Sequence, residues 1–346
     1  MNRDSARTLE FLYRRGLLSS ADLEFGRPTV GETSISHRSF LVSVQGRPRW
    51  FVKSGDPARS HGRDLGMESA VHRLAARHPP LAEVIPRCRL IRADGNLLVM
   101  EAVSGEHIAP PLSVNGHADQ DQEGALRAYG TAAGRVHRTM PPRFGGAPWM
   151  LSALLPQWGT YSWLPPSCGA FLRRLAAVRE IRAVFDRTRA QWLPGRLVHG
   201  DLRWANAIFD AGHSPPRVWL VDWELATSGD PAWDLGSVIA DVAVSNAFDN
   251  RDGADWKRTL ALCRPFFAAY HGAVRPAPQE WQSRMERSLR YAGIRLVQSV
   301  IEIGHDSEPA LLQAEQMLLP AMHAFLFEAA APPDLIHRPE AFEAQA

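Results

Sequence analysis

Two short polar segments near the middle of the chain constrain its fold more than any other feature. The first, His199-Gly-Asp-Leu-Arg-Trp-Ala-Asn206, places an Asp and an Asn five residues apart behind a His-Gly pair. The second, Val221-Asp-Trp-Glu224, places another Asp sixteen residues beyond Asn206, at the end of an apolar run. The two segments therefore supply two carboxylates and one amide oxygen in a fixed order along the chain.

Phosphoryl transfer from a nucleotide requires this set of groups. Asp201 would orient and deprotonate the acceptor hydroxyl, while Asn206 and Asp222 would hold the Mg²⁺ that neutralises charge on the transferred phosphate. Kinase catalytic loops use the pattern Asp-x-x-x-x-Asn, followed downstream by a metal-binding Asp. The ordinary alternatives are a turn-forming Asp201 and an Asn206 that bonds its own backbone.

Composition describes an ordinary globular protein that is large enough for two lobes. The 346 residues are 45% hydrophobic and carry a net charge of +2. The absence of a long apolar run and of an N-terminal signal core argues against a membrane protein. Three widely spaced cysteines, Cys88, Cys168 and Cys263, fit neither a disulfide framework nor a zinc site. These features predict a cytoplasmic protein without a membrane partner, and because the arginines are dispersed we expect no nucleic-acid partner.

The periodicity of apolar residues predicts an α+β chain of two unequal lobes. We expect a helical extension over 1–27, a β-rich lobe over 28–104, a larger helical lobe over 105–331 and a flexible tail over 332–346. The predicted elements of the first lobe and its extension are a helix at 5–15, a hairpin at 40–53 turning at Gly46, a helix at 66–77 and a strand at 97–100. Those of the second lobe are helices at 126–139, 169–192, 251–272, 279–303 and 309–329, with an irregular segment at 141–168.

Lys53 stands out because lysine is almost absent elsewhere. Lys53 and Lys257 are the only lysines, and the other 37 of the 39 basic residues are arginine. Lys53 ends a predicted strand, where kinases place the lysine that binds the α- and β-phosphates and pairs with a helix Glu. Glu68, in the next predicted helix, is the partner we expect. A solvated lysine at a strand end is the ordinary alternative.

The ordered motifs resemble the superfamily of aminoglycoside phosphotransferases and choline kinases, which are small-molecule relatives of protein kinases. The resemblance covers about residues 28–330 and rests on Leu197-Val-His-Gly-Asp201, Asn206, Leu220-Val-Asp-Trp-Glu224 and Gly229-Asp-Pro-Ala-Trp-Asp-Leu235. It implies a protein-kinase-like fold with an antiparallel sheet and one helix in the small lobe. It also implies ATP and Mg²⁺ as cofactors. Trp223-Glu224, where protein kinases have Phe-Gly, is similar to choline kinases.

The resemblance assigns supporting roles to further residues. His199 and Asp234 would brace the catalytic loop, and Glu224 would support the metal or the acceptor. The backbone from Glu101 to Val103 would bind the adenine edge, which leaves ATP and GTP undistinguished. The phosphate-binding loop has one glycine, Gly31, where protein kinases have three, so its phosphate contacts would come from backbone N–H groups and from Ser34, Ser36 or Arg38.

The acceptor is the least constrained part of the prediction. Seven arginines within 173–196 argue against a polycationic acceptor such as an aminoglycoside. A choline site would use an aromatic cage, and Trp149, Trp158, Tyr161 and Trp163 could contribute to one, although lobe packing is their more ordinary role.

A narrower resemblance points to a peptide acceptor. The runs 11–18, 221–241 and 290–299 are similar to a branch that acts beside lyase and cyclase partner proteins in class V lanthipeptide and thioamitide maturation. It implies phosphorylation of Ser or Thr in a precursor peptide. A small-molecule hydroxyl and a nucleotide-binding pseudokinase scaffold remain the alternatives.

Overall fold

The computed structural model describes residues 3–33, 38–55, 65–92, 96–108, 120–155, 163–249 and 255–330. The chain divides into two compact units. Unit 1 comprises residues 1–106 and 219–225, and unit 2 comprises residues 107–218 and 226–346. The short segment 219–225, which carries Asp222, is therefore counted with the N-terminal unit although it lies far along the chain.

Unit 1 is built on a five-stranded antiparallel sheet with the order β1-β2-β3-β5-β4. The hairpin predicted at 40–53 is confirmed as β2 and β3. The strands are β1 (Thr29–Glu32), β2 (Arg38–Val44), β3 (Arg47–Ser54), β4 (Cys88–Ile91) and β5 (Leu97–Glu101). The helices are α1 (Arg3–Arg14), α2 (Ser20–Glu24), α3 (Gly66–Ala75) and α4 (Pro79–Ala82).

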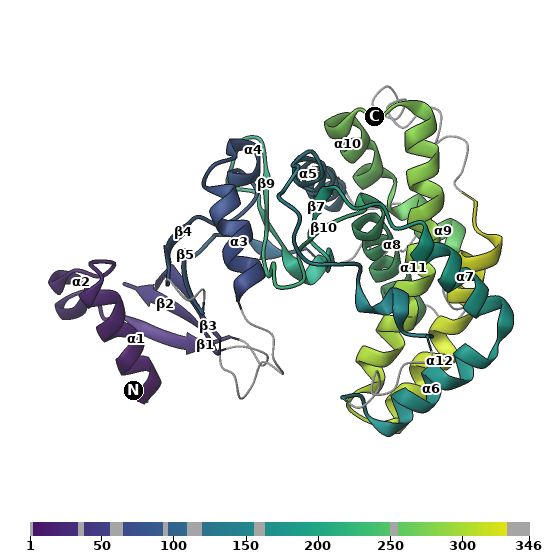
Figure 1. Cartoon of the computed structure of the whole chain (residues 1–346). Coiled ribbons are helices and arrows are strands. Elements are labelled where there is room, and N and C mark those ends of the chain that lie inside the picture. The colour runs from purple at the N-terminus through teal and green to yellow at the C-terminus, as the bar shows by residue number, and fades with distance from the viewer. Residues whose placement is uncertain are drawn as a thin grey trace. The chain divides into compact units, whose positions relative to one another are not determined.

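The two faces of this sheet are covered by different helices, as Figure 1 shows for α1 and α3. Leu9 and Leu12 of α1 pack in one cluster with alternating residues of the strands, including Val42 and Val52. Successive side chains of a strand point to opposite faces, so Lys53 faces away from α1. It meets α3 there through Glu68. The period-two pattern of β3 thus places a lysine on the α3 side of the sheet.

Unit 2 is mainly helical (Figure 1). Its helices are α5 (Gln120–His137), α6 (Pro166–Ala177), α7 (Arg179–Ala190), α8 (Pro231–Asp249), α9 (Trp256–Leu262), α10 (Arg264–Val274), α11 (Pro278–Gly304) and α12 (Glu308–His323). Shorter elements are the 3₁₀ turns η1 (Trp149–Ser152) and η2 (Trp204–Asn206), the π-helix η3 (Ala324–Glu328), and the strands β7 (Arg196–Val198), β8 (Ala207–Asp210) and β10 (Thr227–Gly229). The chain passes between the units within β6 (Glu106–His107), within β9 (Arg217–Leu220) and after Leu225.

Helix α11 forms the centre of unit 2. Its 27 residues span roughly 40 Å, and it packs against α8, α12 and η3. Residues around most of its circumference are buried, Trp281, Leu289 and Val300 among them. A helix that is buried on most sides occupies a core position, so a polar side chain that is buried on it needs a partner inside the protein.

The α+β architecture predicted from the sequence, with an antiparallel N-terminal sheet and a larger helical part, is confirmed. The single helices predicted at 169–192 and 251–272 are each wrong in one respect, because the structure has two helices in each range. α9 ends at Leu262 because Pro265, in the first turn of α10, lacks the N–H that a continuous helix would use. Trp158, Tyr161 and the tail 332–346 lie outside the described residues. None of the described helices is long and apolar enough to cross a membrane.

The contact between α5 and α10 depends on a glycine. A Cβ added at Gly130 would lie 2.1 Å from the Phe266 carbonyl oxygen and 2.9 Å from its carbon. Backbone atoms of a packed helix cannot move aside as the end of a flexible side chain can. The approach of α10 to α5 therefore requires a residue without a side chain at position 130.

We predict that Gly130→Ala lowers the free energy of unfolding by about 1–3 kcal/mol, because overpacking displaces α10. Gly124 of the same helix is the matched control, since an added Cβ there meets no described atom within 4 Å. Gly124→Ala should leave stability unchanged or raise it by about 0.4–1 kcal/mol. Thermal and urea unfolding of both variants measures the difference, and an equally stable Gly130→Ala protein would contradict this packing.

Candidate active site

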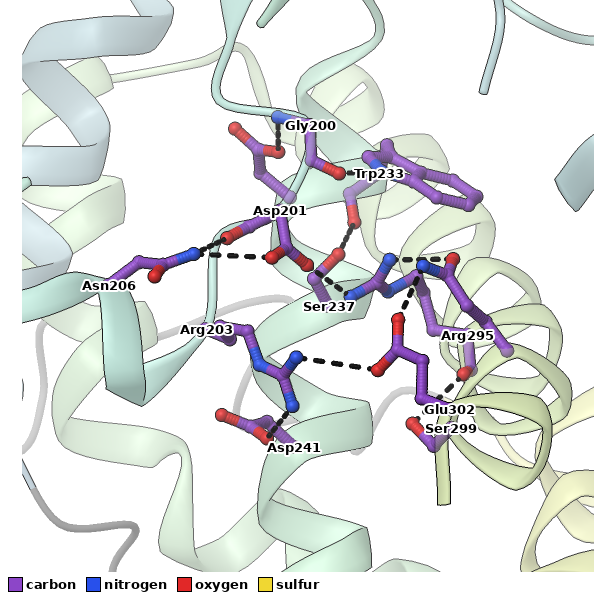
Figure 2. A network of polar contacts seen from close by, with 12 residues as sticks. Gly200, Asp201, Arg203, Asn206, Trp233, Ser237, Asp241, Arg295, Ser299 and Glu302 are labelled. Atoms are coloured by element: carbon purple, nitrogen blue, oxygen red, sulfur yellow. Dashed lines mark hydrogen bonds and ion pairs between the residues drawn. The ribbon is translucent and has the colours of Figure 1, made fainter. Parts of the chain in front are cut away.

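The segment from His199 to Asn206 follows β7 and turns sharply at Gly200. Gly200 has φ +84°, a left-handed conformation that favours glycine. Asp201 and Asn206 then meet across the turn, as Figure 2 shows. The Asn206 Nδ2 donates to the Asp201 backbone oxygen at 2.9 Å and to its Oδ2 at 3.2 Å. Both bonds use Nδ2, so the Asn206 side-chain oxygen points away from Asp201 (Figure 2).

A buried carboxylate on α8 holds this turn in place. Asp234 accepts hydrogen bonds from the backbone N–H groups of His199 at 2.7 Å and Gly200 at 2.9 Å. It also contacts the Nε2 of His137 at 2.9 Å. Burial lowers the pKa of His137, so we infer that its neutral ring donates from Nε2 to Asp234 and accepts the Tyr270 hydroxyl at Nδ1. Asp234 thereby joins the turn, α8 and α5.

Asp201 lies among positive charges. Its Oδ1 accepts a hydrogen bond from the Nη2 of Arg295 at 2.6 Å. Burial alone would raise the pKa of the Asp201 carboxyl, but Arg295, Arg203 and His199 outweigh it, so the pKa lies below its usual value. A carboxylate held in the ionised form can accept a hydrogen bond from a hydroxyl at neutral pH.

A second set of ion pairs surrounds Asp201 in Figure 2. Arg203 pairs with Glu302 of α11 at 3.3 Å and lies 3.9 Å from Asp241 of α8. Asp241 also accepts the backbone N–H of Trp204 at 2.8 Å. No sequence motif predicted a role for Arg203, Asp241, Glu302 or Arg295. The signal available was the spacing of Arg295 and Glu302, which places two charged residues on one face of the otherwise uncharged part of the helix, 291–304.

Unit 1 contains a buried lysine between two carboxylates. The Lys53 Nζ donates to Glu68 Oε2 at 2.7 Å and to Asp222 Oδ1 at 2.5 Å. The side chains of Lys53 and Glu68 are 6% and 2% exposed, whereas that of Asp222 is 42% exposed. Asp222 has φ +65°, a conformation that is uncommon outside glycine and is often stored at functional sites. The turn after β9 therefore leaves an accessible carboxylate beside an anchored ammonium group.

The charges of this cluster keep Lys53 protonated. Burial alone would lower the pKa of Lys53, but the negative charges of Glu68 and Asp222 outweigh it and raise that pKa above its ordinary value. Burial raises the pKa of Glu68, and the Lys53 ammonium offsets part of that rise. Glu224 adds to the rise, so its charge also acts on this cluster.

The remaining predicted nucleotide contacts lie partly outside the described residues. Ser34 and Ser36 are in the range 34–37, which the structure does not describe. Glu101 ends β5. Its backbone N–H donates to the carbonyl oxygen of Arg87, and the backbone N–H of Ala102 donates to the carbonyl oxygen of Arg49. Two N–H groups of the backbone segment predicted to bind the adenine edge are thus used inside unit 1. Val103 follows in a partly exposed position.

Solved structures with the same fold come from several kinases. An ethanolamine kinase from Plasmodium vivax is 11% identical, with a TM-score of 0.59, and the match covers 94% of this chain and 90% of that one. A macrolide 2'-phosphotransferase from Brachybacterium faecium is 18% identical, with a TM-score of 0.52 and coverage of 96% and 100%. The GDP complex of aminoglycoside 2'-phosphotransferase-IIIa is 12% identical, with a TM-score of 0.55 and coverage of 92% and 99%.

At these identities the solved structures establish the fold, which is kinase-like. No curated protein matches the chain. The family model described as the phosphotransferase enzyme family matches residues 32–281. That range covers well over half of the chain and contains Lys53, Glu68, Asp201, Asn206 and Asp222. The chain therefore belongs to the phosphotransferase enzyme family.

Proposed function

We propose that this protein transfers the γ-phosphoryl group of ATP to a hydroxyl of its substrate. The observation that carries the proposal is the Lys53–Glu68–Asp222 cluster of unit 1. Burying a lysine together with two carboxylates has a desolvation cost in folding free energy. Such clusters of buried charges are found preferentially at functional sites. An anchored ammonium group beside an accessible carboxylate is the arrangement that binds nucleotide phosphates and their metal ion.

At the nucleotide, Lys53 would bind the α- and β-phosphates while Glu68 holds its ammonium group in position. The backbone of Glu101 and Val103 would hydrogen-bond the adenine edge, and Ser34 and Ser36 would contact the phosphates. A neighbour of the same fold was solved as a GDP complex, which supports nucleotide binding in this fold. Guanine and adenine nucleotides are therefore both candidate ligands.

At the acceptor, Asp201 would accept a hydrogen bond from the attacking hydroxyl and take its proton. The Asn206 side-chain oxygen and the Asp222 carboxylate are hard oxygen donors of the kind Mg²⁺ prefers, and we propose each of them as a ligand of that ion. Bound Mg²⁺ would neutralise charge on the phosphates. Asp234 accepts the backbone N–H groups of His199 and Gly200, so His199 and Asp234 would brace the turn that carries Asp201. Glu224 would support Asp222 as a metal ligand.

We propose Ser or Thr of a ribosomal natural-product precursor peptide as the acceptor, modified beside a partner lyase or cyclase protein. The charges near Asp201 support an acceptor that is not polycationic. The carboxylates of Asp201, Asp241 and Glu302 each lie beside an arginine of this chain. A polycationic acceptor would have to break these pairs. The alternative is a small-molecule hydroxyl, which the similarity to an ethanolamine kinase and a macrolide phosphotransferase favours.

The role of Lys53 can be tested against the only other lysine. Lys53→Met should weaken ATP binding about tenfold or more, because a charged hydrogen bond to phosphate is worth about 1.5–3 kcal/mol. Lys257 is exposed and lies over the Trp256 ring, so Lys257→Met should bind ATP as the wild type does. Calorimetric titration with ATP and GTP, beside thermal unfolding of each variant, measures this. Equal affinities for the two variants would contradict the phosphate role of Lys53.

The roles of Asp201 and Asp222 predict two inactive proteins that remain folded. Asp222→Ala and Asp201→Ala should each lower Mg²⁺-dependent phosphate transfer by at least about 1,000-fold, because one removes a metal ligand and the other removes the base. Circular dichroism should be unchanged. An active Asp222→Ala protein would overturn the assignment, and activity that persists without any divalent metal would remove Mg²⁺ from it.

An acceptor panel separates the substrate classes. Intact-mass analysis would follow ATP, Mg²⁺ and enzyme with Ser/Thr-rich precursor peptides, ethanolamine, choline, a macrolide and an aminoglycoside. We expect addition of one phosphate mass to a peptide, and its loss with Asp201→Ala. Phosphate on a small molecule alone would replace the peptide proposal with the alternative. Nucleotide binding without transfer, with and without candidate partner proteins, would favour a pseudokinase scaffold.

A further inference from the structure

One arginine of α11 holds the carboxylate of Asp201. Arg295 is only 5% exposed, and its guanidinium carbon lies 5.6 Å from the centre of the Trp233 ring, in cation–π contact. Its Nη2 donates to Asp201 Oδ1 at 2.6 Å and its Nη1 donates to Gln298 Oε1 at 2.7 Å. Trp233 in turn donates its indole N–H to the Gly200 backbone oxygen at 2.8 Å. The guanidinium is therefore fixed on three sides by named partners.

These contacts divide the two oxygens of Asp201 between different partners. Oδ1 accepts the short bond from Arg295, whereas the bond shown for Oδ2 within the described part of the chain is a longer one of 3.2 Å from Asn206. The Asp201 side chain is 19% exposed. Because a carboxylate oxygen can accept more than one hydrogen bond, Oδ2 retains capacity for a hydroxyl. The geometry thus presents one defined oxygen and leaves the other bound to the protein.

The same face of α11 braces the guanidinium against movement. Gln298 lies one turn after Arg295, and its Nε2 donates to Glu302 at 2.8 Å. Glu302 is paired with Arg203, which follows Asp201 in the turn by two residues. Arg295, Gln298, Glu302 and Arg203 therefore form a chain of contacts that links α11 to the segment that carries Asp201.

We propose that Arg295 is a positioning residue for phosphoryl transfer, which fixes the Asp201 side chain so that Oδ2 faces the acceptor hydroxyl. The inference rests on the proposed function. In the transfer step the acceptor oxygen forms the bond to the γ-phosphorus, the bond to the β-phosphate oxygen breaks, and the hydroxyl proton passes to Oδ2. Arg295 exchanges no proton and touches no reacting atom. Its effect is to remove the rotational freedom of the carboxylate before the hydroxyl arrives.

The experiment compares four single variants and one double variant with the wild type. Arg295→Met replaces the guanidinium with a side chain that still packs on Trp233. Arg295→Lys keeps the charge and loses the fork that reaches both Asp201 and Gln298. Arg290→Met is the matched control, because Arg290 lies on the same helix and its hydrogen bond to Gln191 is at the surface. Asp201→Asn, alone and combined with Arg295→Met, completes a double-mutant cycle.

The measurements are kcat and KM for ATP, with the acceptor that accepts phosphate in the panel, and thermal unfolding of each protein. We expect Arg295→Met to lower kcat about 10- to 100-fold and to leave KM for ATP within about twofold. Arg295→Lys should recover part of the loss, and Arg290→Met should match the wild type. In the Asp201→Asn background, Arg295→Met should have little further effect on kcat.

Three outcomes would overturn the inference. An unchanged kcat in Arg295→Met would show that the contact of Arg295 with Asp201 is purely structural, and an increased kcat would show that it is inhibitory. Equal losses of kcat in the wild-type and Asp201→Asn backgrounds would show that Arg295 does not act through Asp201. A decrease in the kcat of Arg295→Met that is fully explained by a smaller folded fraction of the protein would also exclude a positioning role of Arg295. By contrast, a wild-type protein that transfers phosphate to no acceptor would overturn the proposed function itself.

Discussion

The buried carboxylate of Asp234 is the interaction on which the arrangement of unit 2 depends. It receives two backbone N–H groups of the His199–Gly200 turn and the ring of His137. Without it, these donors would be buried with no acceptor, which costs about 1–3 kcal/mol for each group. Because Asp234 lies in the first turn of α8 while His137 ends α5, one side chain fixes the turn against two helices. That turn in turn sets the positions of Asp201 and Asn206.

Both units use the same physical device to keep charges inside the protein. Lys53 is buried between two carboxylates, and Asp201 is paired with a buried arginine. A buried charge without a partner is strongly unfavourable, and a paired one is held in a single geometry. In each cluster one carboxylate oxygen of an Asp, at position 201 or 222, is bound to a cation of the protein. Each ion pair thus offsets the cost of burying its charges, and it also fixes the orientation of the carboxylate of Asp201 or Asp222.

Local elements of this fold could be predicted from the sequence because their patterns are short-range. The β2–β3 hairpin, α3 and α11 follow from alternation, helical spacing and the glycine at the turn. The breaks between α6 and α7 and between α9 and α10 were missed. Pro265 was visible in the sequence, but apolar spacing from Leu260 to Tyr270 continues across it and conceals the interruption. The packing of both helices in one core preserves that spacing.

Local sequence also determined the residue pairs within each motif. Asp201 and Asn206 meet because they are only five positions apart in one turn. Lys53 and Glu68 meet because the helix α3 comes next after the strand β3 along the chain. Tertiary structure alone decided the contacts that cross long separations. Arg295 is 94 residues from Asp201, and Asp222 is 169 residues from Lys53. The choice of Arg295 among 37 arginines depends on the rotation of α11 against α8, which is set by packing of the whole core. No local spacing encodes that rotation, and it decides which cation faces the carboxylate.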